Sequence, residues 1–151
     1  MPLSRYDFSS LGLNSALVDN LSSLGYAEMT PIQAQALPSI LSNKDVIAKA
    51  KTGSGKTATF ALGLLNKLEV KRFRVQTLVL CPTRELADQV AVEIRKLARG
   101  IHNIKVLTLC GGMAFGPQVG SLEHGAHIVV GTPGRVEEHL RKANLNLDNL
   151  T

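Results

Sequence analysis

The sequence predicts an α/β fold in which a mostly parallel β-sheet is flanked by helices. Four short apolar segments have the length of strands, and segments with apolar residues at helical spacing separate them. Strands that alternate with helices favour a parallel sheet whose faces are covered by helices. A second observation typical of this class is a glycine-rich turn between the first of these strands and a helix.

The length and composition permit one packed domain. The chain has 151 residues, of which 44% are hydrophobic and 19% are charged. We expect one structural domain, made of N-terminal helices over residues 1–44 and a nucleotide-binding part over residues 45–151. No apolar run approaches the roughly 18 residues of a membrane span, and residues 1–10 carry no signal-peptide pattern. A cytoplasmic protein without a membrane partner is therefore expected.

Two helices are expected before the first strand. The first repeats leucine at helical spacing over residues 13–24, and the second runs from Pro31 to about Leu41. The expected strands follow as Asp45–Lys49, Thr77–Cys81, Lys105–Cys110 and His127–Gly131. Further helical patterns are carried by Phe60, Ala61, Leu64, Leu65 and Leu68 and by Leu86, Val90, Ile94 and Leu97.

The cysteines and histidines form no metal-ligand pattern. Cys81 and Cys110 each close an apolar run, which predicts buried strand residues in a reducing cytosol, with a redox pair as the alternative. We assign only surface or satisfied polar positions to the four histidines, His102, His124, His127 and His139.

The turn after the first expected strand has the composition of a phosphate-binding loop. It consists of Ala50, Lys51, Thr52, Gly53, Ser54, Gly55, Lys56 and Thr57, with Ala50 where the general pattern has glycine. The glycines let successive amides face inward, and the next helix adds unpaired N–H groups at its positive end. Lys56 would reach the β- and γ-phosphates, and the Thr57 hydroxyl would ligate Mg²⁺. The alternative is a flexible turn with a chance Gly-Lys-Thr.

Two later turns place a hydroxyl and an arginine after a strand. One contains Pro82, Thr83 and Arg84, and the other contains Thr132, Pro133, Gly134 and Arg135. Helix capping by Thr83 or Thr132 explains each turn taken alone. Because ligands bind beyond the carboxyl ends of such strands, the two turns together favour a track for a phosphate backbone. Gly111 and Gly112 form either a plain turn or an opening for a bulky backbone.

The segment Gly25–Gln33 supports two compatible interpretations. Thr30, Pro31 and Gln33 fit a capping box at the start of a helix, and spacing alone favours this reading. The Gln33 amide both donates and accepts, which also suits the N6/N7 edge of adenine, and Tyr26 would supply an aromatic face. A capped helix would hold Gln33 in place for that contact.

These segments resemble, in type and in order, the motifs of the DEAD-box RNA helicases. The similar segments are the Q motif at Gly25–Gln33, with Phe8 as its upstream aromatic, motif I at 50–57, motif Ia at 82–87, the GG motif at 111–112 and motif Ib at 132–135. They cover nearly all of the chain. The stretches 78–90 and 107–112 are especially similar to the bacterial DbpA subgroup.

The resemblance implies a RecA-like P-loop fold that binds ATP or ADP with Mg²⁺ and contacts RNA. It implies that Phe8, Tyr26 and Gln33 surround the adenine, and that residues 50–57 hold the phosphates, with Lys56 and Thr57 in catalytic roles. The implied RNA-backbone contacts are Pro82, Thr83, Arg84, Gly112, Thr132, Gly134 and Arg135. Such contacts carry no base identity, so binding would be sequence-tolerant and salt-sensitive. The subgroup implies action on large-subunit ribosomal RNA during ribosome assembly.

Two motifs of that family, Asp-Glu-Ala-Asp and Ser-Ala-Thr, do not occur in the 151 residues. The resemblance places the acidic motif on a strand that would follow Thr151, and a second RecA-like domain after it. We therefore expect an incomplete first helicase domain that shows no significant ATP hydrolysis or unwinding by itself. We also expect it to be less stable than a complete domain and prone to association at an open sheet edge.

Other functions stay open at this point. The chain could act only as an adenine-nucleotide and RNA-binding module without turnover. An unrelated phosphate-loop protein, such as a GTPase or a small-molecule kinase, is the third reading, and the upstream adenine motif speaks against it. The net charge of +5 is consistent with a polyanionic partner but is common among soluble domains.

Overall fold

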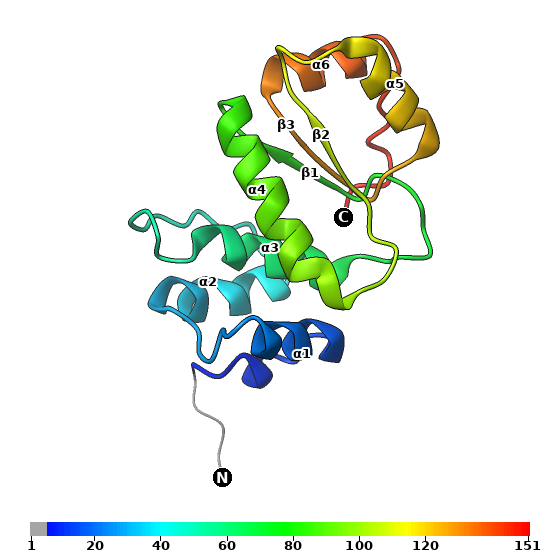
Figure 1. Ribbon diagram of the computed structural model, residues 1–151. Helices are drawn as coiled ribbons and strands as arrows, with labels where there is room; N and C mark the ends of the chain where they lie inside the picture. The colour runs from blue at the N-terminus through cyan, green and yellow to red at the C-terminus, as the bar shows by residue number, and fades with distance from the viewer. Residues whose placement is uncertain (1–5) are drawn as a thin grey trace. The chain divides into compact units, whose positions relative to one another are not determined.

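The structure, a computed structural model, describes residues 6–151 as two compact units (Figure 1). The first unit contains the described residues up to Lys67 together with Lys96–His102. The second contains Leu68–Arg95 and Asn103–Thr151. Helix α4 (Arg84–Leu97) contributes to both, because its last two residues belong to the first unit. The expected single domain with a boundary at residues 44 and 45 stays a prediction.

The first unit is helical. Its elements are the 3₁₀ helices η1 (Phe8–Leu11) and η2 (Ala98–Gly100) and the α-helices α1 (Ser15–Ser23), α2 (Pro31–Leu41) and α3 (Lys56–Lys67). Asn14 begins α1, because its side-chain oxygen accepts a hydrogen bond from the Ala16 amide at 2.9 Å. Helices α2 and α3 pack so closely that a Cβ at Gly63 would overlap the Ile40 side chain.

The expected strand Asp45–Lys49 is wrong. The structure gives this segment no strand, its residues are exposed, and the Ile47 side chain is fully so. Strands are held by hydrogen bonds to a neighbouring strand, and within residues 6–151 none pairs with this segment. A short apolar run is therefore not sufficient to form a strand here.

The second unit contains a parallel sheet of β1 (Thr77–Leu80), β2 (Val106–Leu109) and β3 (Ile128–Gly131) in the order β1-β3-β2. Leu78 and Leu107 both lie opposite Val129. The central strand β3 is buried throughout, as its uninterrupted apolar run requires. The helices α5 (Phe115–His124) and α6 (Pro133–Arg141) complete the unit. Its core includes Leu109, Val129, Val136 and Leu145.

The fold class and the remaining strands are confirmed. The last three predicted strands are each present to within one residue at either end. Helix α5 was not predicted from the sequence, because Gly116, Pro117 and Gly120 are poor helix formers. Proline is nevertheless tolerated in the first turn of a helix. Cys81 and Cys110 are buried and free, as expected for structural cysteines. Across residues 6–151, every helix is too short or too polar to span a bilayer.

Candidate nucleotide and nucleic-acid sites

The predicted phosphate loop is an irregular turn that leads directly into helix α3. Gly53 and Gly55 adopt left-handed backbone angles, with φ of 82° and 90°. Residues with a Cβ rarely adopt these angles, so the two glycines allow the loop to turn back on itself. Helix α3 begins at Lys56, which places its first amides beside the loop.

Gln33 connects helix α2 to this loop. Its side-chain oxygen accepts a hydrogen bond from the Thr30 amide at 2.9 Å, and its Nε2 donates to the Gly55 carbonyl at 3.3 Å. The first bond is half of the capping box that the sequence predicts. The second, which sequence reasoning did not predict, brings the amide to the phosphate loop. Gln33 is almost completely buried by these contacts.

Phe8 and Tyr26 line one cavity of about 390 Å³ in the first unit. Phe8 is buried in η1, whereas Tyr26 is half-buried. The ammonium group of Lys96 lies 5.4 Å from the centre of the Tyr26 ring and donates to its hydroxyl at 3.4 Å. The two predicted aromatic residues are therefore brought together, and Gln33 is not among the residues that line this cavity.

One buried hydroxyl of the loop lacks a partner among the described residues. The buried Ser54 hydroxyl has no hydrogen-bond partner among residues 6–151. Thr57 is half-buried in the first turn of α3, where its hydroxyl would ligate the Mg²⁺ of a bound nucleotide. In the described part of the chain, no group of three or more His, Cys, Asp or Glu side chains could hold a metal ion by itself.

The three turns of the second unit meet at one edge of its sheet, because parallel strands end on the same side. The Cys81 amide donates to the Gly131 carbonyl at 2.9 Å, and the Thr132 amide donates to the Leu109 carbonyl at 3.1 Å. A Cβ at Gly112 would lie 3.9 Å from Nη1 of Arg84. The residues at this edge include the exposed Pro82, Thr83, Arg84, Gly112 and Gly134 and the half-buried Thr132 and Arg135.

The two threonines at this edge act differently. Thr83 caps helix α4, because its hydroxyl accepts a hydrogen bond from the Leu86 amide at 3.2 Å. Thr132 stands at the N-cap of α6, but its hydroxyl makes no cap bond and accepts from the Gly111 amide at 3.0 Å. Thr132 therefore links the turn after β3 to the turn after β2.

The sequence and the fold have known counterparts. Residues 30–151 match the model of the DEAD/DEAH box helicase family. The chain belongs to this family. It is 59% identical over 95% of its length to ATP-dependent RNA helicase DbpA of Escherichia coli (strain K12), of which it spans 32%. It is 48% identical over 95% of its length to ATP-dependent RNA helicase DeaD of Buchnera aphidicola subsp. Schizaphis graminum, of which it spans 24%.

Solved DEAD-box structures share the fold. A DEAD box protein from the hyperthermophile Methanococcus jannaschii is 39% identical with a TM-score of 0.90, and the match covers 97% of this chain and 40% of that one. S. cerevisiae Dbp5 bound to RNA and ADP BeF3 is 27% identical with a TM-score of 0.87, over 97% of this chain and 37% of that one. The predicted DEAD-box membership and RecA-like fold are confirmed. The chain spans a third or less of the two curated relatives named above.

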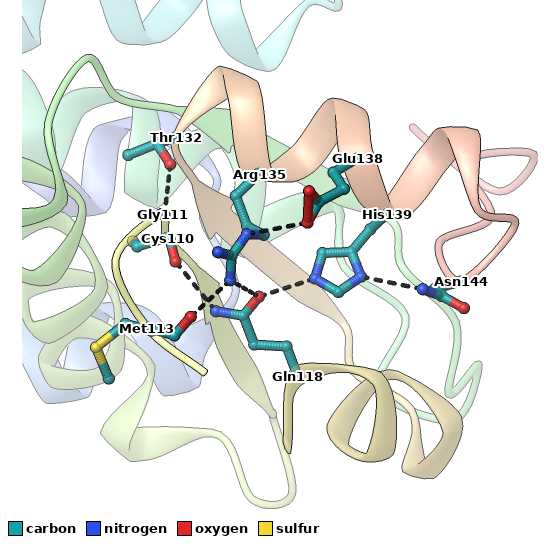
Figure 2. Close-up of polar contacts among 9 residues, drawn as sticks. All are labelled: Cys110, Gly111, Met113, Gln118, Thr132, Arg135, Glu138, His139 and Asn144. Atoms are coloured by element: carbon teal, nitrogen blue, oxygen red, sulfur yellow. Dashed lines mark hydrogen bonds and ion pairs between the residues drawn. The ribbon is translucent and has the colours of Figure 1, made fainter. Parts of the chain in front are cut away.

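Sequence reasoning missed two polar residues of this DEAD-box chain. Gln118 and His139 are buried beside the edge of the sheet that carries the three turns, and they hydrogen-bond to each other (Figure 2). The pattern assigned His139 only a surface or a satisfied polar position, and the structure shows it buried and hydrogen-bonded. Their spacing in the sequence could have linked His139 to Arg135. His139 follows Arg135 by about one turn of the predicted helix, which puts both on the same face.

Proposed function

We propose that this chain is the nucleotide-binding part of an ATP-dependent DEAD-box RNA helicase, and that it binds ATP or ADP with Mg²⁺ and the backbone of RNA. The observation that carries the proposal is the bond from Gln33 to Gly55, because it places the side chain that we propose hydrogen-bonds adenine against the loop that we propose holds the phosphates. The relatives support it: two are named ATP-dependent RNA helicases, and Dbp5 was solved with RNA and ADP BeF3.

The proposed nucleotide contacts fall into two groups, those to the adenine and those to the phosphates with Mg²⁺. Phe8 and Tyr26 pack against the adenine, and Gln33 hydrogen-bonds its edge. The amides of residues 50–55 wrap the phosphates, the Lys56 ammonium neutralises their charge, and the Thr57 hydroxyl holds Mg²⁺. Bound ATP supplies the phosphoryl group whose transfer to water drives a helicase.

The proposed RNA contacts lie at the sheet edge of the second unit. Amides and hydroxyls of the turns donate to phosphate oxygens, and the arginines add charge. The proposed residues are Pro82, Thr83, Arg84, Gly112, Thr132, Gly134 and Arg135. Binding is then independent of base sequence and weakens with salt.

A titration of the chain with a fluorescent ADP analogue and Mg²⁺ tests the nucleotide part. We expect saturable binding that ATP displaces and GTP does not, and a loss of about tenfold, or about 1.4 kcal/mol, in Gln33→Ala. Gln35→Ala is the matched control, because Gln35 is exposed on the same helix. Equal displacement by GTP would favour an unrelated phosphate-loop protein, and no binding by a folded chain would contradict the proposal.

Turnover separates the enzyme from a binding module. Phosphate release that RNA stimulates and Lys56→Ala abolishes would favour an ATPase within these residues. Nucleotide binding without release would favour the module. A parallel titration with short single-stranded oligouridine at increasing salt measures the RNA part independently.

We extend the proposal to the whole protein, which we infer acts in the cytoplasm on ribosomal RNA during ribosome assembly. The similarity to the DbpA subgroup supports this inference. Cells that lack the protein should accumulate incomplete large subunits in a sucrose-gradient profile. An unchanged profile would contradict this part of the proposal and leave the binding activities untouched.

A further inference from the structure

A buried hydrogen-bond network, here called the Gln118 network, joins helices α5 and α6 to the turn after β2. It consists of the side chains of Gln118, Arg135, His139 and Asn144 and the carbonyls of Cys110 and Met113 (Figure 2). Gln118 is 7% exposed and His139 is 0% exposed, so water does not compete for the bond between them. Buried amides and imidazoles that are fully bonded fix one arrangement.

The bonding pattern determines which atoms of Gln118 face which partner. Its Nε2 donates to the Cys110 carbonyl at 3.2 Å, so the amide oxygen faces the opposite side. That oxygen accepts from Arg135 Nη1 at 3.1 Å and lies 2.8 Å from His139 Nε2. Because an amide oxygen only accepts, His139 must carry its proton on Nε2.

The contact at Nδ1 of His139 is consistent with a proton on Nε2. The Asn144 amide nitrogen lies 3.4 Å from Nδ1 of His139, which accepts in a neutral ring protonated at Nε2. The Phe115 ring stacks on the imidazole, with a centroid separation of 4.3 Å. Burial lowers the pKa of His139, the positive charges of Arg135 and Lys142 lower it further, and Glu138 opposes them. A neutral His139 is thus a donor of fixed direction.

Arg135 is held by several partners yet keeps free donors. Its Nη1 donates to the Met113 carbonyl at 2.9 Å and to Gln118, and its Nε lies 3.5 Å from Glu138. The side chain is 15% exposed. Within residues 6–151, the hydrogen bonds of the guanidinium all come from Nη1, so the two N–H groups of Nη2 remain donors without a hydrogen-bond partner there.

We propose that Gln118 and His139 are positioning residues that hold the Arg135 guanidinium and the turn 110–113 in the arrangement that receives an RNA phosphate. The inference rests on the proposed function, because it assumes that Arg135 and Gly112 contact the backbone. His139 orients Gln118, Gln118 binds Arg135 and the Cys110 carbonyl, and Thr132 holds the Gly111 amide. A guanidinium held in advance loses less entropy when it binds phosphate.

Three variants of the full chain separate positioning from general stability. His139→Leu removes the donor to Gln118, and Gln118→Met removes all polar bonds of that side chain at similar volume. His139→Gln returns an N–H group to about the place of Nε2 and should rescue the loss. His124→Leu is the matched control, because His124 is exposed at the end of α5.

The decisive readout is the slope of the logarithm of oligouridine affinity against the logarithm of salt concentration. Loss of one phosphate contact should reduce the magnitude of this slope by about 0.7 in His139→Leu, in Gln118→Met and in the reference variant Arg135→Gln. The double variant of His139→Leu with Arg135→Gln should equal Arg135→Gln alone. The affinity for ADP should stay unchanged, because the phosphate loop belongs to the other unit.

The proton–nitrogen NMR signal of Arg135 Nε reports positioning without RNA. It should become mobile in His139→Leu and Gln118→Met and stay ordered in His139→Gln. Variants that melt earlier but keep both the slope and an ordered Arg135 signal would overturn the inference. If the unmodified chain shows no salt-dependent RNA binding, the RNA part of the proposed function falls, and the Arg135 signal still decides whether the two residues position it.

Gln118→Glu keeps the test decisive if the apolar variants fail to fold. The carboxylate retains the shape of the side chain and still accepts from Arg135 and His139, but it cannot donate to the Cys110 carbonyl. We expect weaker oligouridine binding together with faster hydrogen exchange at the Gly111 amide. Unchanged affinity and unchanged exchange would overturn the role assigned to Gln118.

Discussion

At the scale of single residues, Gly55 shows how closely the proposed phosphate loop packs against Gln33. Its φ of 90° belongs to the region that glycine favours, and an added Cβ would overlap Nε2 of Gln33. Its carbonyl also accepts from the Thr59 hydroxyl at 2.8 Å. The Gln33 amide therefore packs so closely against the loop that no side chain fits at position 55 unless Gln33 moves.

Gly55→Ala should destabilise the chain more than Gly53→Ala. Both substitutions place a Cβ at positive φ, which costs about 1–2 kcal/mol, but only the first displaces Gln33. A Cβ at Gly53 would meet nothing within 4 Å. Urea unfolding of the two variants measures the difference, which we expect to be about 1 kcal/mol. Equal destabilisation would show that Gln33 moves aside without cost.

At the scale of elements, one buried polar side chain satisfies the carbonyls at the end of another helix. Asn20 in α1 is buried, and its Nδ2 donates at 2.9 Å to the carbonyls of both Lys96 and Leu97. These carbonyls belong to the end of α4, where the last helical carbonyls need outside partners. One amide thereby joins α1 to the last two residues of α4, within the first unit.

Asn20→Ala should lower the free energy of unfolding by about 1–3 kcal/mol, because it leaves two carbonyls without their donor. Ser23→Ala serves as the control, since Ser23 is exposed at the end of the same helix. Thermal and urea unfolding measure the effect. A loss no larger than that of Ser23→Ala would mean that water replaces the amide.

Within residues 6–151, the segment Asp45–Lys49 pairs with no strand and exposes the apolar side chain of Ile47. Ile47→Asp should reduce self-association at high concentration and leave the melting temperature nearly unchanged, because the Ile47 side chain contributes no burial. Sedimentation velocity measures the association. Ala48→Asp adds the same charge to an exposed neighbour. A monomeric unmodified chain would contradict the prediction that this segment drives association.

At the scale of the whole molecule, acid should destabilise the fold through buried histidine. The pKa of His139 lies below its ordinary value of 6.5 in the folded chain, chiefly because of burial. The unfolded chain therefore binds more protons just below pH 6.5. The contribution of neutral His139 to the free energy of unfolding is fully present above pH 6.5. It is lost as pH falls toward the pKa of His139 in the folded chain.

The melting temperature should accordingly fall on acidification below pH 6.5, and less steeply in His139→Gln. His124→Gln, at an exposed position, should follow the unmodified chain. Asp7 does not interfere, because hydrogen bonds from Ser9 lower its pKa from 3.8 and its contribution is lost only in stronger acid. Parallel profiles for the unmodified chain and His139→Gln would contradict this prediction.

The sequence by itself determined the fold class, the three strands of the sheet and the position of the glycine-rich turn before helix α3. Each depends on local information, namely the period of apolar residues or the glycines of one turn. It also placed Thr83, Thr132 and Gln33 correctly at helix starts, because caps lie within a few residues of the amides they serve.

Only the tertiary structure decided what those residues contact. The Thr132 hydroxyl binds Gly111 instead of its own helix, and Gln33 reaches Gly55. Gln118 joins Arg135 to His139, and 45–49 forms no strand. In each case the outcome depends on a partner distant along the chain, or on the lack of one among the described residues. Local patterns carry no information on such partners, because folding alone brings them together.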